Sequence, residues 1–164
     1  MIILGIDPGL ATLGYGVIEA EGDKRRLIQY GILSTKAGEP TPHRLRSIFR
    51  GVNQLLDIYK PDDVAFEELF FSKNVTTGMA VSAARGVAIV AVADRTDNLY
   101  EYTPNQIKQA VTGYGGAGKQ QVQQMVKMLL NMKEIARPDD AADGLAVALT
   151  HANSMHMKKM FKIQ

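Results

Sequence analysis

The fold is decided by the N-terminal stretch Ile2-Ile3-Leu4-Gly5-Ile6-Asp7-Pro8-Gly9. Its apolar run predicts a short buried strand, and the Asp-Pro-Gly sequence predicts a turn directly after it. Two further strands are expected at residues 14–19 and 27–34, because a polar turn at residues 21–24 separates them. Three short strands joined by tight links predict an antiparallel meander.

After residue 42 the apolar residues follow a helical period. They recur at Leu45, Ile48, Val52, Leu55, Leu56 and Tyr59, and Pro61 ends the helix that this spacing predicts. A buried strand at residues 64–66 then leads into Glu67. A helix rich in Ala and Gly is expected from Thr76 or Thr77 to about Asp94.

The C-terminal third alternates helices with short connections. We expect a strand at residues 99–102, a short helix from Pro104, a glycine-rich loop at residues 113–118, and helices at residues 120–131 and 139–153. The order βββ-α-β-α-β-α-α-α predicts an α/β fold. Its mixed five-stranded sheet would combine the three-strand meander with two parallel strands and carry helices on both faces.

The composition indicates one intracellular domain. The chain has 164 residues, no Cys and a formal net charge of only +2, so any nucleic-acid function has to rest on where the charges lie. The N-terminus lacks a basic signal-peptide region, and the apolar residues 86–93 fall short of the ~18 that a membrane span needs. We expect a soluble cytoplasmic protein without a membrane partner. Residues 1–154 would form the domain and residues 155–164 a basic, solvated and partly disordered tail, with DNA contact as the alternative.

Four acidic residues form the candidate active site. Asp7 and Glu67 follow the first and fourth strands, so both side chains emerge at one sheet edge if those strands are parallel neighbours. Asp140 and Asp143 are three residues apart in the last helix and therefore share a face. Packing of that face on the strand ends would gather four carboxylates.

Such a cluster requires cations. Two carboxylates ~4 Å apart repel each other by about 4 kcal/mol at an effective dielectric constant of 20. Two Mg²⁺ ions would balance the four charges, with Mn²⁺ as a substitute, since both prefer oxygen ligands. Two ions ~3.5–4 Å apart can activate water and stabilise the leaving oxygen of a phosphodiester, which indicates a nuclease.

Each acid also has a plain structural explanation. Asp-Pro-Gly is an ordinary turn, Glu67 could pair with a basic residue, and Asp139 and Asp140 suit the start of a helix. Asp143 lies deeper, in an apolar stretch where capping does not account for it.

These segments resemble the RuvC family of Holliday junction resolvases over nearly the whole chain. The matching pieces are Gly5-Ile6-Asp7-Pro8-Gly9, Gly14-Tyr15-Gly16, Glu67 within residues 66–74, Ala84-Arg85-Gly86-Val87-Ala88, Lys108-Gln109, Asp140-Ala141-Ala142-Asp143 and Thr150-His151. The resemblance implies a ribonuclease H-like homodimer that nicks two opposed strands of a four-way DNA junction, leaving 5′-phosphate and 3′-hydroxyl ends. RuvA and RuvB are the implied partners.

The resemblance also assigns residue roles. Asp7, Glu67, Asp140 and Asp143 match the family's metal-binding acids. Phe70 matches an aromatic residue that stacks on junction bases, although burial in the core is the alternative. Lys108 and Lys119 match basic positions near the cleaved phosphate. Glu68 departs from the pattern, because a neutral amide is expected there.

Other motifs remain open or misleading. Residues 113–120 contain G-x-G-x-x-G and G-x-x-x-x-G-K, but Gln120 replaces the Ser or Thr of a P-loop, so a flexible loop carrying Lys119 or a plain connector fits better. Asp7 and its turn also resemble an actin-like phosphate loop, for which the chain is too short. Arg44, Arg46 and Arg50 could form a solvated face or contact phosphates. His151 is expected to make a core or interface hydrogen bond, with an outer catalytic role as the lesser alternative.

Two rival functions stay open. An RNA-processing nuclease could have the same fold, and a junction-binding module without activity could share the shape. The four intact acids argue against the second.

Overall fold

A computed structural model describes residues 1–69 and 75–164. Its five strands form one sheet in the order β3-β2-β1-β4-β5. They are β1 (Ile2–Asp7), β2 (Thr12–Glu21), β3 (Lys24–Ser34), β4 (Asp63–Glu67) and β5 (Leu99–Tyr102). The first three strands pair antiparallel, whereas β4 pairs parallel with both β1 and β5. The expected meander and the expected parallel pairing of β1 with β4 are therefore confirmed.

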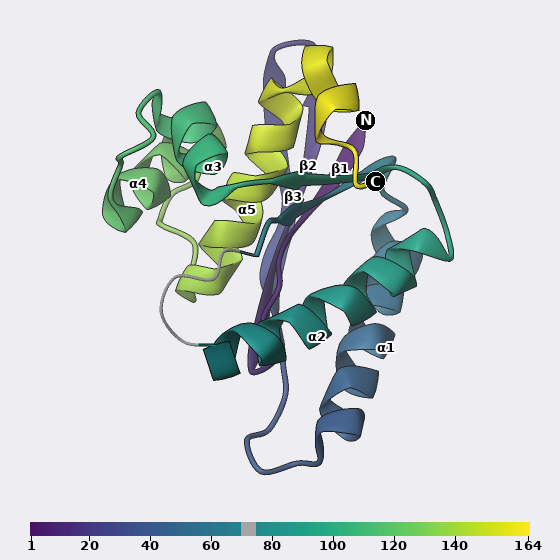
Figure 1. Ribbon diagram of the computed structural model, residues 1–164. Helices are drawn as coiled ribbons and strands as arrows, with labels where there is room; N and C mark the ends of the chain where they lie inside the picture. Colours follow the sequence, from purple (N-terminus) through teal and green to yellow (C-terminus); the bar gives the residue numbers. More distant parts are fainter. Residues whose placement is uncertain (70–74) are drawn as a thin grey trace.

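Helices cover both faces of the sheet (Figure 1). They are α1 (Thr41–Tyr59), α2 (Val75–Ala93), α3 (Pro104–Thr112), α4 (Lys119–Leu129) and α5 (Asp139–Asn153), followed by the 3-10 helix η1 (Met155–Phe161). One apolar core joins the sheet to α1 and α2, and a second joins it to α3, α4 and α5. Alternate strand residues feed the two cores, since successive side chains of a strand point to opposite faces.

Glycines allow α5 to pack directly against the backbone of β2. A Cβ atom added to Gly14 would lie 1.8 Å from the Asp140 carbonyl oxygen, and one added to Gly144 would lie 2.6 Å from the Tyr15 Cα. Such distances are possible only without a side chain. Because Gly14 is the register partner of Asp7 in β1, the first turn of α5 lies beside the end of β1.

Helix α2 corrects one expectation. Its window Thr76–Ala93 is long and apolar enough to cross a membrane by length and composition, although only 22% of that window is buried. The apolar stretch expected from the sequence, residues 86–93, covers only the second half of this window. The one charged residue of α2 is Arg85, which pairs with Glu101.

The C-terminal segment also differs from expectation. Residues 155–161 form η1 on the edge of the sheet, and the ring of Phe161 lies 4.7 Å from that of Tyr102. Lys162 bridges to Tyr100 in β5, and the Ile163 N–H donates to the Leu99 carbonyl. These contacts order a segment that we expected to be partly disordered. The division of the chain at residue 154 stays a prediction.

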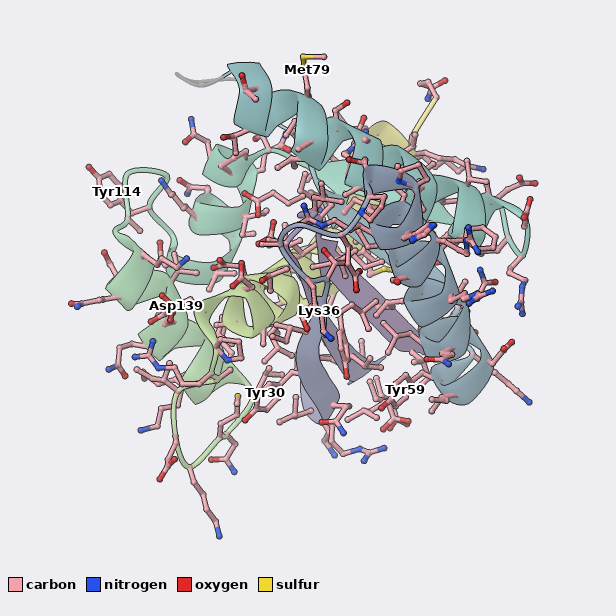
Figure 2. All side chains as sticks on the ribbon, turned by 90° about the horizontal axis from the view of Figure 1, so that it is seen from below. Tyr30, Lys36, Tyr59, Met79, Tyr114 and Asp139 are labelled. Carbon is pink, nitrogen blue, oxygen red and sulfur yellow. The ribbon has the colours of Figure 1, made fainter. Side chains whose placement is uncertain are left out.

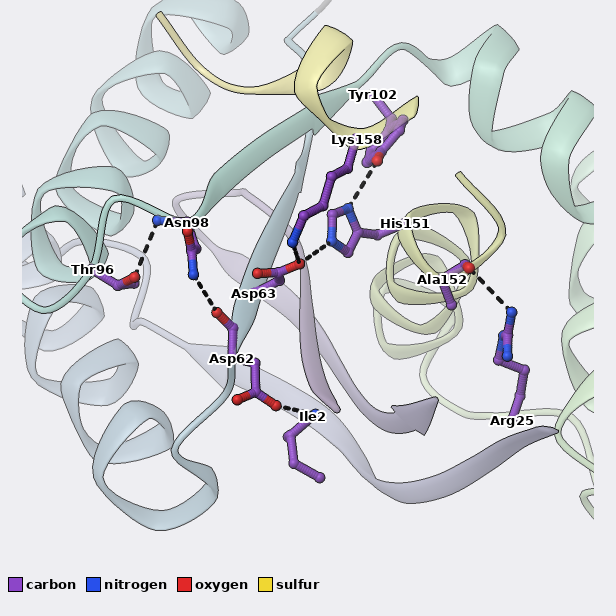
Figure 3. A network of polar contacts seen from close by, with 10 residues as sticks. All are labelled: Ile2, Arg25, Asp62, Asp63, Thr96, Asn98, Tyr102, His151, Ala152 and Lys158. Atoms are coloured by element: carbon purple, nitrogen blue, oxygen red, sulfur yellow. Dashed lines mark hydrogen bonds and ion pairs between the residues drawn. The ribbon is translucent and has the colours of Figure 1, made fainter. Parts of the chain in front are cut away.

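A buried polar network holds η1 to the domain (Figure 3). The Nε2 atom of His151 lies 2.9 Å from the Asp63 carboxylate, and its Nδ1 atom lies 2.8 Å from the Tyr102 hydroxyl. Lys158 of η1 donates to the same Asp63 oxygen at 2.9 Å. His151 thus makes the expected core hydrogen bond. The network lies at the start of β4 and the end of α5, opposite the four acids.

Acid should weaken this network. Burial tends to raise the pKa of Asp63, but hydrogen bonds from His151 and Lys158 lower it below its usual value of 3.8. Because the folded pKa is the lower one, the carboxylate contributes stability above pH 4 and loses it as pH falls through the folded pKa. We expect the free energy of unfolding measured in urea at pH 7 to be about 2 kcal/mol lower for Asp63→Asn than for wild type, with a smaller difference at pH 3. An equal difference at both pH values would contradict the charge-based explanation.

Candidate active site

Three elements carry the four candidate acids to one edge of the sheet. Asp7 ends β1 and Glu67 ends β4, and these strands are parallel neighbours, so both side chains leave the sheet at the same edge. Asp140 and Asp143 lie in the first turns of α5, which the close contact at Gly14 holds against β2. The structure therefore brings together the two pairs that the sequence placed on separate elements.

The carboxyl groups repel one another. Burial is the largest of the effects that together raise the pKa of Asp7 from its usual 3.8 to about 8, and the charges of Glu67, Asp143 and Asp140 contribute the rest with a hydrogen bond to Glu67. Burial and Asp143 raise the pKa of Glu67, although a hydrogen bond with Asp7 works in the opposite direction. A proton between Asp7 and Glu67 would relieve part of this repulsion. Carboxyl groups with raised pKa values at such close quarters favour the binding of cations.

Two lysines supply part of that charge. The Lys119 Nζ atom lies 3.0 Å from the Asp143 carboxylate and 4.0 Å from that of Asp139. Burial tends to lower the pKa of Lys119, but the bond to Asp143 raises it above its usual value. Lys108 lies close enough to lower the pKa of Glu67. Both lysines line a 250 Å³ hollow with Glu67 and Asp143.

The four acidic side chains have the chemistry of a divalent-metal site but are not arranged in a metal-coordinating geometry. Among residues 1–69 and 75–164, no three His, Cys, Asp or Glu side chains are arranged as a ready metal site. The carboxylate oxygens of Asp7, Glu67, Asp140 and Asp143 are nevertheless the hard ligands that Mg²⁺ and Mn²⁺ prefer. Burial and the neighbouring carboxylates raise the pKa of Asp7, Glu67 and Asp143, so a bound cation would relieve repulsion within the group. The residues therefore fit such ions, and their role as metal ligands stays a prediction.

The remaining candidates divide into three groups. Phe70 lies outside the described residues. The glycine-rich loop connects α3 to α4, as expected, and ends at Lys119, the first residue of α4. Glu68 is half-buried and its N–H donates to the Tyr102 carbonyl at 2.8 Å, which continues the ladder between β4 and β5.

One positioning feature of the site was not predicted from the sequence. Gly14 was expected only to begin a strand and to match the family, whereas in the structure its missing side chain sets how closely Asp140 approaches β2. The detectable signal was a glycine inside a strand, which often marks the close approach of another backbone.

Comparison with solved structures defines the class of protein. A structure of Thermus thermophilus RuvC in complex with a Holliday junction substrate matches with a TM-score of 0.90 and 39% identity, covering 96% of each chain. The yeast mitochondrial Holliday junction resolvase matches with a TM-score of 0.69, covering 98% of this chain and 82% of that one, but its 15% identity supports the fold alone. Together with the sheet order, these matches define a nuclease of the ribonuclease H-like fold.

Sequence comparison identifies the family. The model of the family described as crossover junction endodeoxyribonuclease RuvC matches residues 3–151. The crossover junction endodeoxyribonuclease RuvC of Alkaliphilus metalliredigens is 54% identical over the full length of both chains. That of Brevibacillus brevis is 55% identical over 93% of this chain and 92% of its own. The chain belongs to the RuvC family of endonucleases, and the family resemblance read from the sequence is confirmed.

Proposed function

We propose that this protein resolves four-way DNA junctions by a pair of symmetric nicks. The observation that carries the proposal is the gathering of Asp7, Glu67, Asp140 and Asp143 at one sheet edge, in a chain that matches the family over residues 3–151. The Thermus thermophilus relative, which was solved with a Holliday junction substrate, supports the same type of DNA for this chain.

The four acids would hold two Mg²⁺ ions, with Mn²⁺ able to replace them. When bound, such ions supply Lewis-acid activation of water and neutralise charge on the phosphate. Lys108 and Lys119 lie beside Glu67 and Asp143, where they would attract and orient the phosphate to be cleaved. Products with 5′-phosphate and 3′-hydroxyl ends would be ready for ligation. Phe70, outside the described residues, would stack on junction bases.

Family membership supports a proposal for the partners of this protein. The branch-migration proteins RuvA and RuvB would deliver the junction, and the reaction belongs to recombination and repair of DNA in the cytoplasm. A second copy of this chain would supply the second nick, since paired cuts in a two-fold symmetric substrate suit a two-fold symmetric dimer.

Helix α2 supports the dimer. One of its faces is exposed and mostly apolar, and consists of Met79, Ser82, Ala83, Gly86, Val90 and Ala93. Met79 points away from the body of the molecule (Figure 2). Glycine lowers the stability of a helix by about 1 kcal/mol relative to Ala. A Cβ atom at Gly86 would meet nothing within 4 Å, so no contact within this chain explains why the position is glycine. A close-packed partner helix would explain it.

A side chain at Gly86 should therefore separate the two copies. We expect Gly86→Glu to fold normally, because its position is open, but to halve the molar mass measured by light scattering at micromolar concentration. Ile58→Glu changes an apolar residue of α1 that is 67% exposed, and it should leave the mass unchanged. If wild type is already monomeric, the homodimer is excluded.

A side-by-side cleavage assay tests the proposed function. Four-way DNA, linear duplex DNA and structured RNA of matched length are incubated with the protein and Mg²⁺. We expect the four-way junction to be cut at symmetric positions and the other two substrates to remain largely intact. Preferential cleavage of RNA would favour the RNA-processing alternative. Junction binding without cleavage, together with no Mn²⁺ binding in calorimetry, would favour the inactive module.

A further inference from the structure

A second hollow flanks the candidate acids on the side away from Lys108 and Lys119. It has a volume of about 490 Å³ and is enclosed by the turn between β1 and β2, the start of α1, the start of α2 and Asp140. Asp140 therefore borders this hollow, whereas Glu67 and Asp143 border the lysine hollow. A strand lying across the four acids would have one of these hollows on each side of the cleaved bond.

Of the residues that the structure describes, one cationic side chain lines the second hollow. Arg44 of α1 is half-buried there, while Arg46 and Arg50 of the same helix are exposed and do not line it. The structure thus separates three arginines that the sequence could not distinguish. None of the carboxylates in the described part of the chain forms an ion pair with Arg44.

Arg44 is held in place by a short chain of hydrogen bonds from the turn after β1. The Thr35 N–H donates to the Ala11 carbonyl at 3.0 Å, and the Thr35 hydroxyl donates to the Leu10 carbonyl at 2.6 Å. The Arg44 Nε–H then donates to the Thr35 hydroxyl at 2.8 Å. The guanidinium is thereby fixed relative to the strand that ends at Asp7. Its two NH₂ groups have the geometry for a paired contact with phosphate oxygens.

We propose that this second hollow is a phosphate subsite in which Arg44 binds the DNA strand on the side of the cleaved bond opposite Lys108 and Lys119. The inference rests on the proposed junction cleavage. Arg44 and the two lysines would then bind the strand on both sides of the acids and hold the cleaved phosphate over them. Arg44 acts as a positioning residue, because it reaches a neighbouring phosphate and not the reacting atoms. Thr35 keeps its guanidinium oriented before DNA arrives.

Single-phosphate neutralisation tests the subsite. Junctions carry one uncharged methylphosphonate at a time, on either side of the cleaved phosphate, and single-turnover cleavage is measured with Mg²⁺. For wild type, neutralising the phosphate that Arg44 contacts should slow cleavage about tenfold. In Arg44→Gln, which still has a side-chain N–H for Thr35, cleavage should be about tenfold slower and indifferent to that same neutralisation. Neutralisation on the lysine side should retain its full effect.

Two comparisons exclude a general structural effect. Arg46→Gln removes an exposed charge from the same helix, and its cleavage rate and neutralisation profile should match wild type within about twofold. The log–log salt dependence of junction binding in EDTA should become shallower by about 0.9 in Arg44→Gln, the slope expected for one lost phosphate contact. Cleavage by Arg44→Gln at the wild-type rate, or slower cleavage with an unchanged neutralisation profile, would overturn the subsite. If wild type cuts no junction, the proposed function fails and the subsite fails with it.

Discussion

Asp7→Asn is expected to abolish junction cleavage while leaving junction binding intact. Asp7 ends the central strand β1, and the charges of Glu67, Asp143 and Asp140 all act on it, so its carboxylate is well placed to share cations with the other three. Asn keeps the shape of the side chain but removes its charge. The loss of about 4 kcal/mol of transition-state stabilisation would slow single-turnover cleavage by about a thousandfold. Binding measured in EDTA should stay within about twofold.

The same substitution should stabilise the metal-free protein at alkaline pH. Burial and neighbouring carboxylates raise the pKa of Asp7 to about 8 from its usual 3.8. Because the folded pKa is the higher one, wild type loses stability as pH rises from about 4 through 8, whereas Asn has no charge to develop. Thermal unfolding in EDTA should therefore show Asp7→Asn melting above wild type at pH 8.5 and close to it near pH 4.

Added Mn²⁺ should reverse this order. Ions that bind only the folded state raise its stability, and wild type has one more ligand than the variant. A variant that still nicks the four-way junction at the wild-type rate would exclude Asp7 from the chemistry. A variant that fails to bind the junction would instead indicate a damaged fold, which the melting curves would reveal.

The sheet and the placement of the acids could be predicted from the sequence because both depend on local patterns. The apolar run before Asp7 and the one before Glu67 define strand ends, and the three-residue spacing of Asp140 and Asp143 defines a helix face. The parallel pairing of β1 with β4 and the packing of α5 against the strand ends had to be assumed, and the structure has both. Strand ends and helix periods are short-range features, which makes them readable from one sequence.

The features that escaped prediction depend on distant contacts. Order in the C-terminal segment arises from Lys158 reaching Asp63, a residue 95 positions earlier, and from Phe161 packing on Tyr102. The difference between Arg44 and Arg46 arises from a hydrogen bond to Thr35 and from the shape of a hollow. From composition alone the tail is simply polar and the three arginines are equivalent. Composition does not show which side chain contacts which partner in the folded chain.

Gly14→Ala is expected to reduce cleavage by about a hundredfold although it changes no chemical group of the site. Gly14 faces Asp7 across the β1–β2 ladder, and a Cβ atom there would lie 1.8 Å from the Asp140 carbonyl oxygen. Ordinary van der Waals contact begins at 3.4 Å, so the separation has to nearly double. The atom in the way belongs to the backbone, which cannot rotate aside as a flexible side chain could. The first turn of α5 must therefore move away from β2, and Asp140 moves with it.

The consequence for activity should exceed the consequence for stability. Overpacking a close contact costs roughly 1–3 kcal/mol, which a domain of this size can tolerate. A catalytic group displaced by about 1 Å can cost a hundredfold in rate, because the groups no longer meet the phosphate together. Gly14→Ala should thus melt cooperatively at a modestly lower temperature while single-turnover cleavage falls steeply. Its Mn²⁺ affinity should also fall, since Asp140 would be pulled away from Asp7.

Gly31→Ala provides the matched control for crowding without displacement of an acid. Gly31 lies on the edge strand β3, and a Cβ atom there would lie 2.8 Å from the Tyr15 hydroxyl. This hydroxyl is the end of a side chain, whereas the atom that crowds Gly14 belongs to the backbone. We expect a similar or smaller loss of stability with cleavage and Mn²⁺ affinity near wild type. If Gly31→Ala and Gly14→Ala lose activity to the same extent, general destabilisation explains both results. If only Gly14→Ala loses it, the absence of a side chain at Gly14 is what sets Asp140 beside Asp7.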